Sequence, residues 1–147
     1  MNFKNILQFL IIISISLICS IQDFRYKKIP NYIIYAGYIL MLISLAFFTG
    51  IEVIFNFLSS LFLFIFYFIT MKIVKNKLGF GDILFGAFSG LCLNLKFDII
   101  SVLLSVFLCF FYLILNNFIT KKGIKTKTAF IPFMSLSLII SFIIMNI

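Results

Sequence analysis

Long runs of apolar residues, separated by short polar stretches, cover most of the chain. Within each run the apolar positions are continuous and do not alternate with polar ones, which predicts helices and not the strands of a barrel. Because about 20 mostly apolar residues cross a bilayer, the runs predict six membrane-spanning helices, of which the fourth is short. Their approximate bounds are Asn5–Ile21, Tyr32–Thr49, Val53–Met71, Asp82–Leu95, Ile99–Phe118 and Ala129–Met145. The expected fold is an all-α integral membrane bundle, formed by residues 1–147 as a single domain.

The composition indicates the same environment and excludes several kinds of active site. The chain of 147 residues is 64% hydrophobic and 11% charged, whereas globular proteins are about 45–50% apolar and about 25% charged. It contains no His, which excludes a Ser-His-Asp triad, a Cys-His pair and a His-ligated metal. The three cysteines lie in apolar runs without CxxC spacing, so we expect neither a metal site nor a cofactor.

The basic residues predict the orientation of the helices. Ten of the 12 Lys and Arg residues fall in the first, third and fifth loops: Arg25, Lys27, Lys28, Lys72, Lys75, Lys77, Lys121, Lys122, Lys125 and Lys127. By the positive-inside rule these loops lie in the cytoplasm and both termini lie outside. The net charge of +8 is therefore interpreted as an orientation signal, and we expect no binding of nucleic acid. A cleaved signal peptide is disfavoured, because the basic first loop would then have to cross the membrane.

Only four acidic residues are available for carboxylate chemistry: Asp23, Glu52, Asp82 and Asp98. Glu52 and Asp98 fall in short turns on the outer side, where we expect ordinary solvated charges, with Lys96 near Asp98 to balance it. Asp23 ends the first predicted helix and Asp82 opens the fourth, so both are expected at the cytoplasmic boundary. An ionisable residue at that depth is a candidate for function. The alternative is that both carboxylates lie in headgroup water.

Small residues accompany both of these aspartates. Asp82, Gly86 and Gly90 share one helix face, and the GxxxG spacing lets another helix approach closely. On the first helix a second stripe of small side chains leads to Asp23, formed by Ser16, Cys19 and Ser20. We expect these two faces to pack against each other and so to bring the two carboxylates together.

Two facing carboxylates can hydrolyse a peptide bond without any other group. One ionised Asp acts as a general base on water, while a protonated one polarises the carbonyl and then protonates the leaving amine. They share one proton because like charges at short distance cannot both ionise. Gly79 and Gly81, just before Asp82, allow tight backbone turns and the close approach of an extended peptide. The alternative is a plain junction in which Asp82 is an N-cap or first-turn acid.

Three stretches carry motifs: DFRYKKIPN at residues 23–31, GFGD at residues 79–82 and FIPF at residues 130–133. They resemble the D-x-R-x-x-x-I-P-N signature, the G-x-G-D motif and the last-helix Pro-Phe stretch of the type 4 prepilin peptidases, which are GxGD-type membrane aspartyl proteases. The resemblance implies that Asp23 and Asp82 are the catalytic pair. It also implies a multi-pass enzyme of the inner membrane whose active site faces the cytoplasm. The implied substrate is a prepilin or pseudopilin, cut between its short basic leader and its hydrophobic helix.

The chain departs from the family pattern in two places. It has no cytoplasmic insert with two CxxC pairs, so it resembles the short forms of tight-adherence pilus systems or archaeal preflagellin peptidases, and we expect no N-methylation. Two residues after Asp82, where the family often has Lys, stands Leu84, which removes the basis for a substrate contact there.

Three further residues of the first motif are given supporting roles. Arg25 either balances the charge of the aspartate pair, contacts the substrate, or serves only as an inside-positive anchor. Pro30 and Asn31 are expected to end the loop and start the second helix.

Two alternatives to prepilin cleavage remain. One is a GxGD protease that cuts another membrane peptide, such as a signal peptide. The other is a non-catalytic membrane scaffold with the same fold, against which the two intact motifs count.

Overall fold

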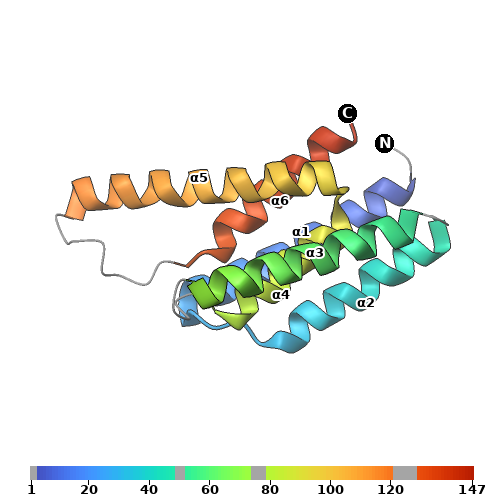
Figure 1. The fold of residues 1–147 in the computed structure, drawn as a ribbon, viewed down its shortest axis with the longest axis horizontal. Coiled ribbons are helices and arrows are strands. Elements are labelled where there is room, and N and C mark those ends of the chain that lie inside the picture. Colours follow the sequence, from blue (N-terminus) through green and yellow to red (C-terminus); the bar gives the residue numbers. More distant parts are fainter. Residues whose placement is uncertain (1–2, 49–51, 74–78, 121–128) are drawn as a thin grey trace.

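The computed structural model describes residues 3–48, 52–73, 79–120 and 129–147. Within these residues the chain forms helices and no strand, which confirms the predicted all-α fold (Figure 1). The helices are α1 (Phe3–Tyr26), α2 (Asn31–Phe48), α3 (Glu52–Ile73), α4 (Phe80–Cys92), α5 (Leu95–Thr120) and α6 (Ile131–Met145).

The helices differ in how far they can reach across a bilayer. Three of them, α1, α3 and α5, are long and apolar enough to span it, whereas α2, α4 and α6 are shorter apolar helices. The 13 residues of α4 extend about 20 Å at about 1.5 Å per residue, which is less than the roughly 30 Å hydrocarbon core. The prediction of a short fourth helix is therefore confirmed.

The short helix α4 forms the core of the bundle. All residues from Ile83 to Leu93 are buried, and α4 contacts α3 most extensively, with further contacts to α2, α5 and α6. Its glycines allow α3 to approach closely: a Cβ atom on Gly90 would lie 2.6 Å from the Cα of Ser60, and one on Gly86 would overlap the ring of Tyr67. The GxxxG face of α4 is therefore covered by α3.

The stripe of small residues on α1 faces a different helix. The helix α1 packs mainly on α6 and α2, and the hydroxyl oxygens of Ser20 and Ser135 lie 2.7 Å apart, which joins α1 to α6. The prediction that the small-residue faces of α1 and α4 pack on each other is therefore wrong. A small face accepts any helix that comes close, and consecutive helices are usually neighbours, so the glycines of α4 are filled by α3.

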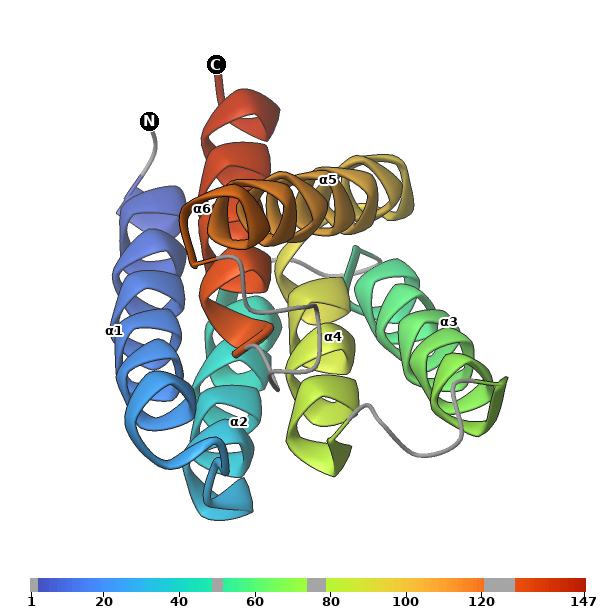
Figure 2. The same ribbon diagram turned by 90° about the vertical axis from the view of Figure 1, so that its left-hand side faces the viewer.

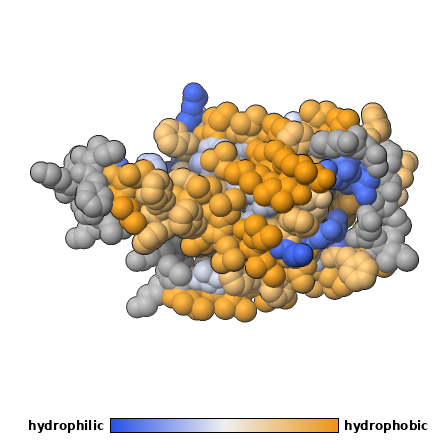
Figure 3. All heavy atoms as spheres, turned by 90° about the horizontal axis from the view of Figure 1, so that it is seen from above, coloured by the Kyte–Doolittle hydropathy of each residue, from blue (hydrophilic) through white to orange (hydrophobic). Residues whose placement is uncertain are grey.

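The helix α5 lies partly apart from the others. It crosses over α6, and its C-terminal half extends beyond the remaining helices (Figures 1 and 2). Its outward side chains, such as Leu103, Phe107 and Phe110, are more than half exposed. Hydrophobic side chains cover most of the face of the molecule on which α5 lies (Figure 3). In a bilayer these side chains face lipid, and the exposure of so much apolar surface fits a membrane protein.

Candidate active site

Asp23 lies near the end of α1, where this helix meets the start of α6. Its side chain is only 8% exposed, and its Oδ2 accepts a hydrogen bond from the backbone N–H of Ile131 (3.1 Å). The backbone N–H of Phe130 also donates to this carboxyl. The first N–H groups of a helix have no partner within the helix, and Pro132, in the first turn of α6, has no N–H to satisfy. Asp23 therefore caps α6 from a different helix.

The chain turns sharply just after Asp23. Lys27 has a φ of 50°, and its N–H donates to the carbonyl oxygen of Asp23 (2.9 Å), an arrangement that ends many helices. The positive charge of Lys27 acts on the Asp23 carboxyl, as does the positive N-terminal end of α6. The side chain of Arg25 is exposed. The role predicted for Arg25 in balancing the charge of the aspartates therefore gains no support, and Lys27 is the basic residue that acts on Asp23.

Asp82 is the third residue of α4 and is half-buried. Its Oδ2 accepts a hydrogen bond from the N–H of Gly79 (2.8 Å), and its own N–H donates to the carbonyl oxygen of Gly79 (3.1 Å). This reciprocal pair is the capping arrangement in which a first-turn acid holds the start of its own helix. Asp82 and Asp23 thus each use Oδ2 to hold the start of a helix, α4 in one case and α6 in the other.

The two motif glycines, Gly79 and Gly81, allow close contacts and do not adopt unusual backbone angles. Among the described residues no glycine has a positive φ, and Gly79 lies at φ −75° and ψ 151°. Gly79 and Gly81 therefore do not use the left-handed backbone angles that only glycine adopts readily. A Cβ atom on Gly81 would lie 3.3 Å from the side chain of Ile29, so Gly81 lets the connection between α1 and α2 lie against the start of α4. This contact joins the first motif to the second.

The three motifs gather at one end of the bundle, which faces the viewer in Figure 2. Residues 130–131 bind Asp23, Ile29 contacts Gly81, and the charge of Asp23 acts on Asp82. The carboxylates are therefore held at this end by α6 and by the α1–α2 connection. The packing of the two small-residue faces, from which their proximity was predicted, plays no part in it.

The remaining residues of the first two motifs have clear structural positions. Asn31 is the first residue of α2, and the carbonyl oxygen of Pro30 accepts a hydrogen bond from the N–H of Ile33 (3.1 Å), which confirms their predicted place at the start of this helix. Leu84 is 7% exposed and belongs to the core. Since its side chain is buried, Leu84 replaces the family's Lys with a packing residue.

Asp98 contradicts the prediction made for it. The helix α5 begins at Leu95, so Asp98 lies inside the first turn of a helix, and its side chain is 0% exposed. Ser59 donates a hydrogen bond to its Oδ2, while its Oδ1 has no partner among the described residues. Lys96, which was expected to balance this charge, is exposed. A solvated charge in a turn is therefore the wrong description.

A signal for the burial of Asp98 is present in the sequence. Asp98, Ser101 and Ser105 follow the spacing i, i+3, i+7, which places them on one helix face, and all three are buried. When an otherwise apolar membrane helix has one polar face, that face is expected to point to the interior of the bundle. Glu52, the other acid expected on this side, begins α3, and its side chain lies outside the described residues.

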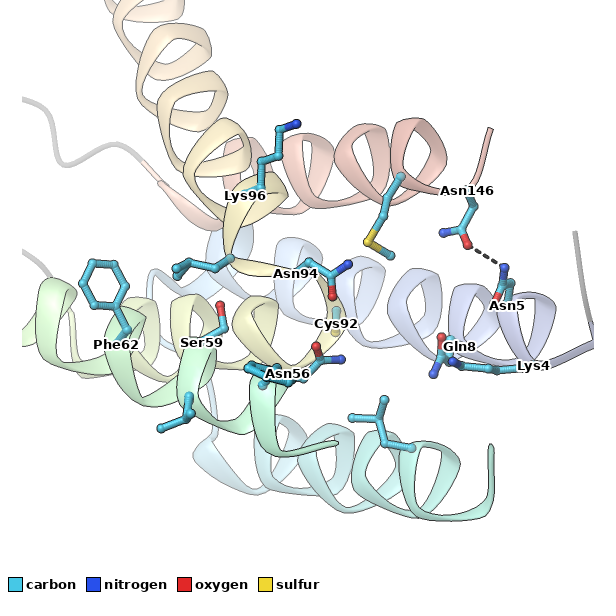
Figure 4. Close-up of a pocket in the computed structure, with 15 residues that line it drawn as sticks. Lys4, Asn5, Gln8, Asn56, Ser59, Phe62, Cys92, Asn94, Lys96 and Asn146 are labelled. Atoms are coloured by element: carbon cyan, nitrogen blue, oxygen red, sulfur yellow. Dashed lines mark hydrogen bonds between the residues drawn. The ribbon is translucent and has the colours of Figure 1, made fainter. Parts of the chain in front are cut away.

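A cavity of about 820 Å³ lies between the helices at one end of the bundle (Figure 4). Both chain termini lie at this end (Figure 1). Neither Asp23 nor Asp82 lines it, so this hollow is distinct from the candidate active site. In the described part of the chain no three His, Cys, Asp or Glu residues gather where they could hold a metal ion.

A model of the type IV leader peptidase family matches residues 10–114, more than two thirds of the chain. The chain therefore belongs to this family of proteases. The matched range includes Asp23 and the GFGD segment, whereas the motif at residues 130–133 lies beyond it. Comparison with curated proteins and with solved structures gives no match.

Proposed function

We propose that this leader peptidase is an aspartic endopeptidase of the inner membrane that removes the cytoplasmic leader from prepilins or pseudopilins. One observation carries the proposal: the DFRYKKIPN, GFGD and FIPF segments, far apart in the sequence, meet at one end of the bundle and bring two carboxylates there. The negative charge of Asp23 disfavours ionisation of Asp82. Family membership supports a peptidase, and the aspartate pair supplies its chemistry.

In the proposed reaction one of the two carboxylates is ionised and the other holds a proton. The ionised one takes a proton from water, and the resulting hydroxide adds to the carbonyl carbon of the scissile peptide. The protonated one donates a hydrogen bond to the carbonyl oxygen as negative charge develops on it. The amine then leaves with a proton from the pair, which returns to its starting state with one proton shared.

The charge distribution supports a cytoplasmic position for this end. Arg25, Lys27 and Lys28, together with Lys72 at the end of α3, are exposed in the described part of the chain. Positive loops remain in the cytoplasm. The other basic residues used for this prediction, Lys75, Lys77, Lys121, Lys122, Lys125 and Lys127, lie outside the described residues. A precursor with a short leader ahead of a hydrophobic helix places its cleavage point at this same boundary.

The proposal is tested by co-expressing a prepilin with the wild type, Asp23→Asn or Asp82→Asn and following leader removal by gel mobility and mass spectrometry. Each variant is expected to lose roughly 10²–10⁴-fold in rate, the usual effect of removing an acid–base group. Asn keeps an oxygen that accepts the N–H of Ile131 or Gly79, so both helix starts are expected to survive. Circular dichroism and thermal unfolding in detergent check this.

Each outcome has a defined meaning. A folded variant that cuts at the wild-type rate would contradict the aspartate pair. A wild type that leaves every prepilin intact but cuts a different membrane peptide would favour the other GxGD protease activity. A wild type that cuts neither, while it is folded in the membrane, would favour a scaffold.

A further inference from the structure

The cavity at the end of the bundle opposite Asp23 and Asp82 has unpartnered polar groups in its wall. Gln8 is 5% exposed and Asn56 is 8% exposed, and both line the cavity. The Nδ2 of Asn56 donates to the carbonyl oxygen of Leu91 (3.3 Å). Among the described residues Oδ1 of Asn56 and Nε2 of Gln8 have no hydrogen-bond partner. A buried donor and a buried acceptor in one cavity are suited to a polar ligand that offers both an acceptor and a donor.

The charged side chains that line the cavity are basic and favour an anionic ligand. Lys4 and Lys96 line it, and within the described residues no carboxylate side chain does. Asp98 is fully buried and hydrogen-bonded to Ser59. Figure 4 shows the amide side chains of Asn56 and Asn94 extending into the space between the helices. Positive groups combined with amide donors are suited to a phosphate group, whose oxygens accept several hydrogen bonds.

The depth of the cavity corresponds to the level of lipid headgroups. Lys4 and Asp23 both belong to α1, and their separation in sequence corresponds to about 28 Å along the helix. This distance is close to the roughly 30 Å thickness of the hydrocarbon core. If Asp23 lies at one boundary of the membrane, the cavity therefore lies at the other boundary.

The cavity is also continuous with the lipid-facing surface. Phe55, Leu58 and Phe62 of α3 line it, yet their side chains are 66%, 55% and 52% exposed. A ligand in the cavity thus meets apolar side chains on its way out toward the bilayer. Figure 3 shows polar atoms next to hydrophobic ones toward the end at which the termini lie. A soluble phosphate ester would use only the polar part of this surface, whereas a phospholipid uses both parts.

We propose that this cavity binds the headgroup of one phospholipid from the leaflet at that end of the bundle. The phosphate lies near Lys4 and Nε2 of Gln8, and a hydroxyl or ammonium donor of the headgroup binds Oδ1 of Asn56. The acyl chains follow the exposed face of α3. This site is separate from the proposed protease activity and does not depend on it.

The test uses the full chain, purified in detergent and titrated with phosphatidylglycerol or phosphatidylcholine, with native mass spectrometry to count bound lipids. One phosphatidylglycerol per chain is expected. Phosphatidylcholine is expected to bind roughly tenfold more weakly, because choline has no donor for Asn56 and cancels the negative charge. Gln8→Leu and Lys4→Gln are each expected to weaken phosphatidylglycerol binding roughly tenfold.

Lys72→Gln is the matched control, because it removes the same charge at the opposite end of the bundle, and it is expected to bind the lipid like the wild type. Gln8→Leu removes an unpaired buried group, so without lipid its melting temperature is expected to equal or exceed that of the wild type. Equal lipid binding by the wild type, Gln8→Leu and Lys4→Gln would overturn the proposal, as would an equal loss in Lys72→Gln. Glycerol 3-phosphate is added as a competitor. If it binds as tightly as phosphatidylglycerol, the ligand is a soluble phosphate ester and the lipid assignment is overturned.

Discussion

The two ends of the bundle each contain carboxylates close to helix termini, but they hold them in different ways. At one end Asp23 and Asp82 accept hydrogen bonds from backbone N–H groups at the starts of α6 and α4. At the other end Asp98 accepts its hydrogen bond from the side chain of Ser59 and is completely buried. Of the three aspartates, the most buried one is therefore the one that lies outside the sequence motifs.

Under the proposed function, burial by itself therefore does not identify the catalytic acids. The pair at the first end is held by backbone groups and by segments that are distant in sequence, and it lies beside the connection between α1 and α2. Asp98 lies between helices, where none of its side chain is exposed. The two ends are therefore expected to respond differently to the same chemical change, and four sets of variants compare those responses, beginning with the largest effect.

The largest effect is expected from the same substitution at opposite ends. Asp82→Asn is expected to lower prepilin cleavage roughly 10²–10⁴-fold, whereas Asp98→Asn is expected to change it less than about threefold, because it removes no acid–base group from the site. Leader removal measured under single-turnover conditions compares the two. A similar loss in both variants would mean that Asp98 takes part in the reaction or that the two ends are coupled.

A second comparison uses glycines. Gly90→Ala places a Cβ atom 2.6 Å from the backbone of Ser60, so α3 has to move, and we expect a loss of about 1–3 kcal/mol in the free energy of unfolding. Gly81→Ala meets only the side chain of Ile29 at 3.3 Å, and a smaller loss is expected. Because Ile29 lies beside the candidate active site, Gly81→Ala is nevertheless expected to slow prepilin cleavage while its melting temperature stays close to that of the wild type.

Thermal unfolding in detergent and prepilin cleavage, measured on the same preparations, test these two glycine variants. A stability loss from Gly81→Ala as large as that from Gly90→Ala would contradict the assignment of Gly90 to a rigid helix contact. If Gly81→Ala cleaves prepilin at the wild-type rate, the α1–α2 connection plays no part in the reaction.

A third comparison separates the structural and chemical roles of Asp23. Asp23→Ala removes the acceptor for the N–H of Ile131, and we expect a loss of about 1 kcal/mol, as for other lost helix caps. Asp23→Asn keeps an acceptor oxygen and is expected to stay close to the wild type in stability. Both variants are expected to be inactive in cleavage. Equal stability of the two would show that the hydrogen bond to α6 contributes nothing.

The smallest effect is expected at the contact between α1 and α6. Ser20→Ala removes the hydrogen bond to Ser135, and polar contacts between membrane helices contribute about 0.6 kcal/mol on average. Ser14→Ala is the matched control, because the Ser14 hydroxyl donates to the carbonyl oxygen of Leu10 within its own helix. Chemical unfolding curves of the two variants, compared with the wild type, are expected to differ by about this amount.

Most of the helices could be predicted from the sequence, and their ends less well. The helix α1 continues to Tyr26 and α5 begins at Leu95, whereas the apolar runs suggest an end near Ile21 and a start near Ile99. Hydrophobicity marks only the part of a helix that lies in the hydrocarbon core, while the helical backbone continues into the polar boundary. The late start predicted for α5 placed Asp98 in a turn and led to the wrong description of its environment.

The sequence by itself determined the all-α membrane fold and the short fourth helix, and it singled out Asp23 and Asp82 as the candidates for catalysis. Hydrophobic runs and motifs are local properties, and in a bilayer each helix satisfies its own backbone. The tertiary structure decided which faces meet. The bond from Ile131 to Asp23 spans 108 positions, and the burial of Asp98 depends on Ser59 of another helix. Small and apolar faces fit many partners equally well, so only the packing of the whole bundle selects among them.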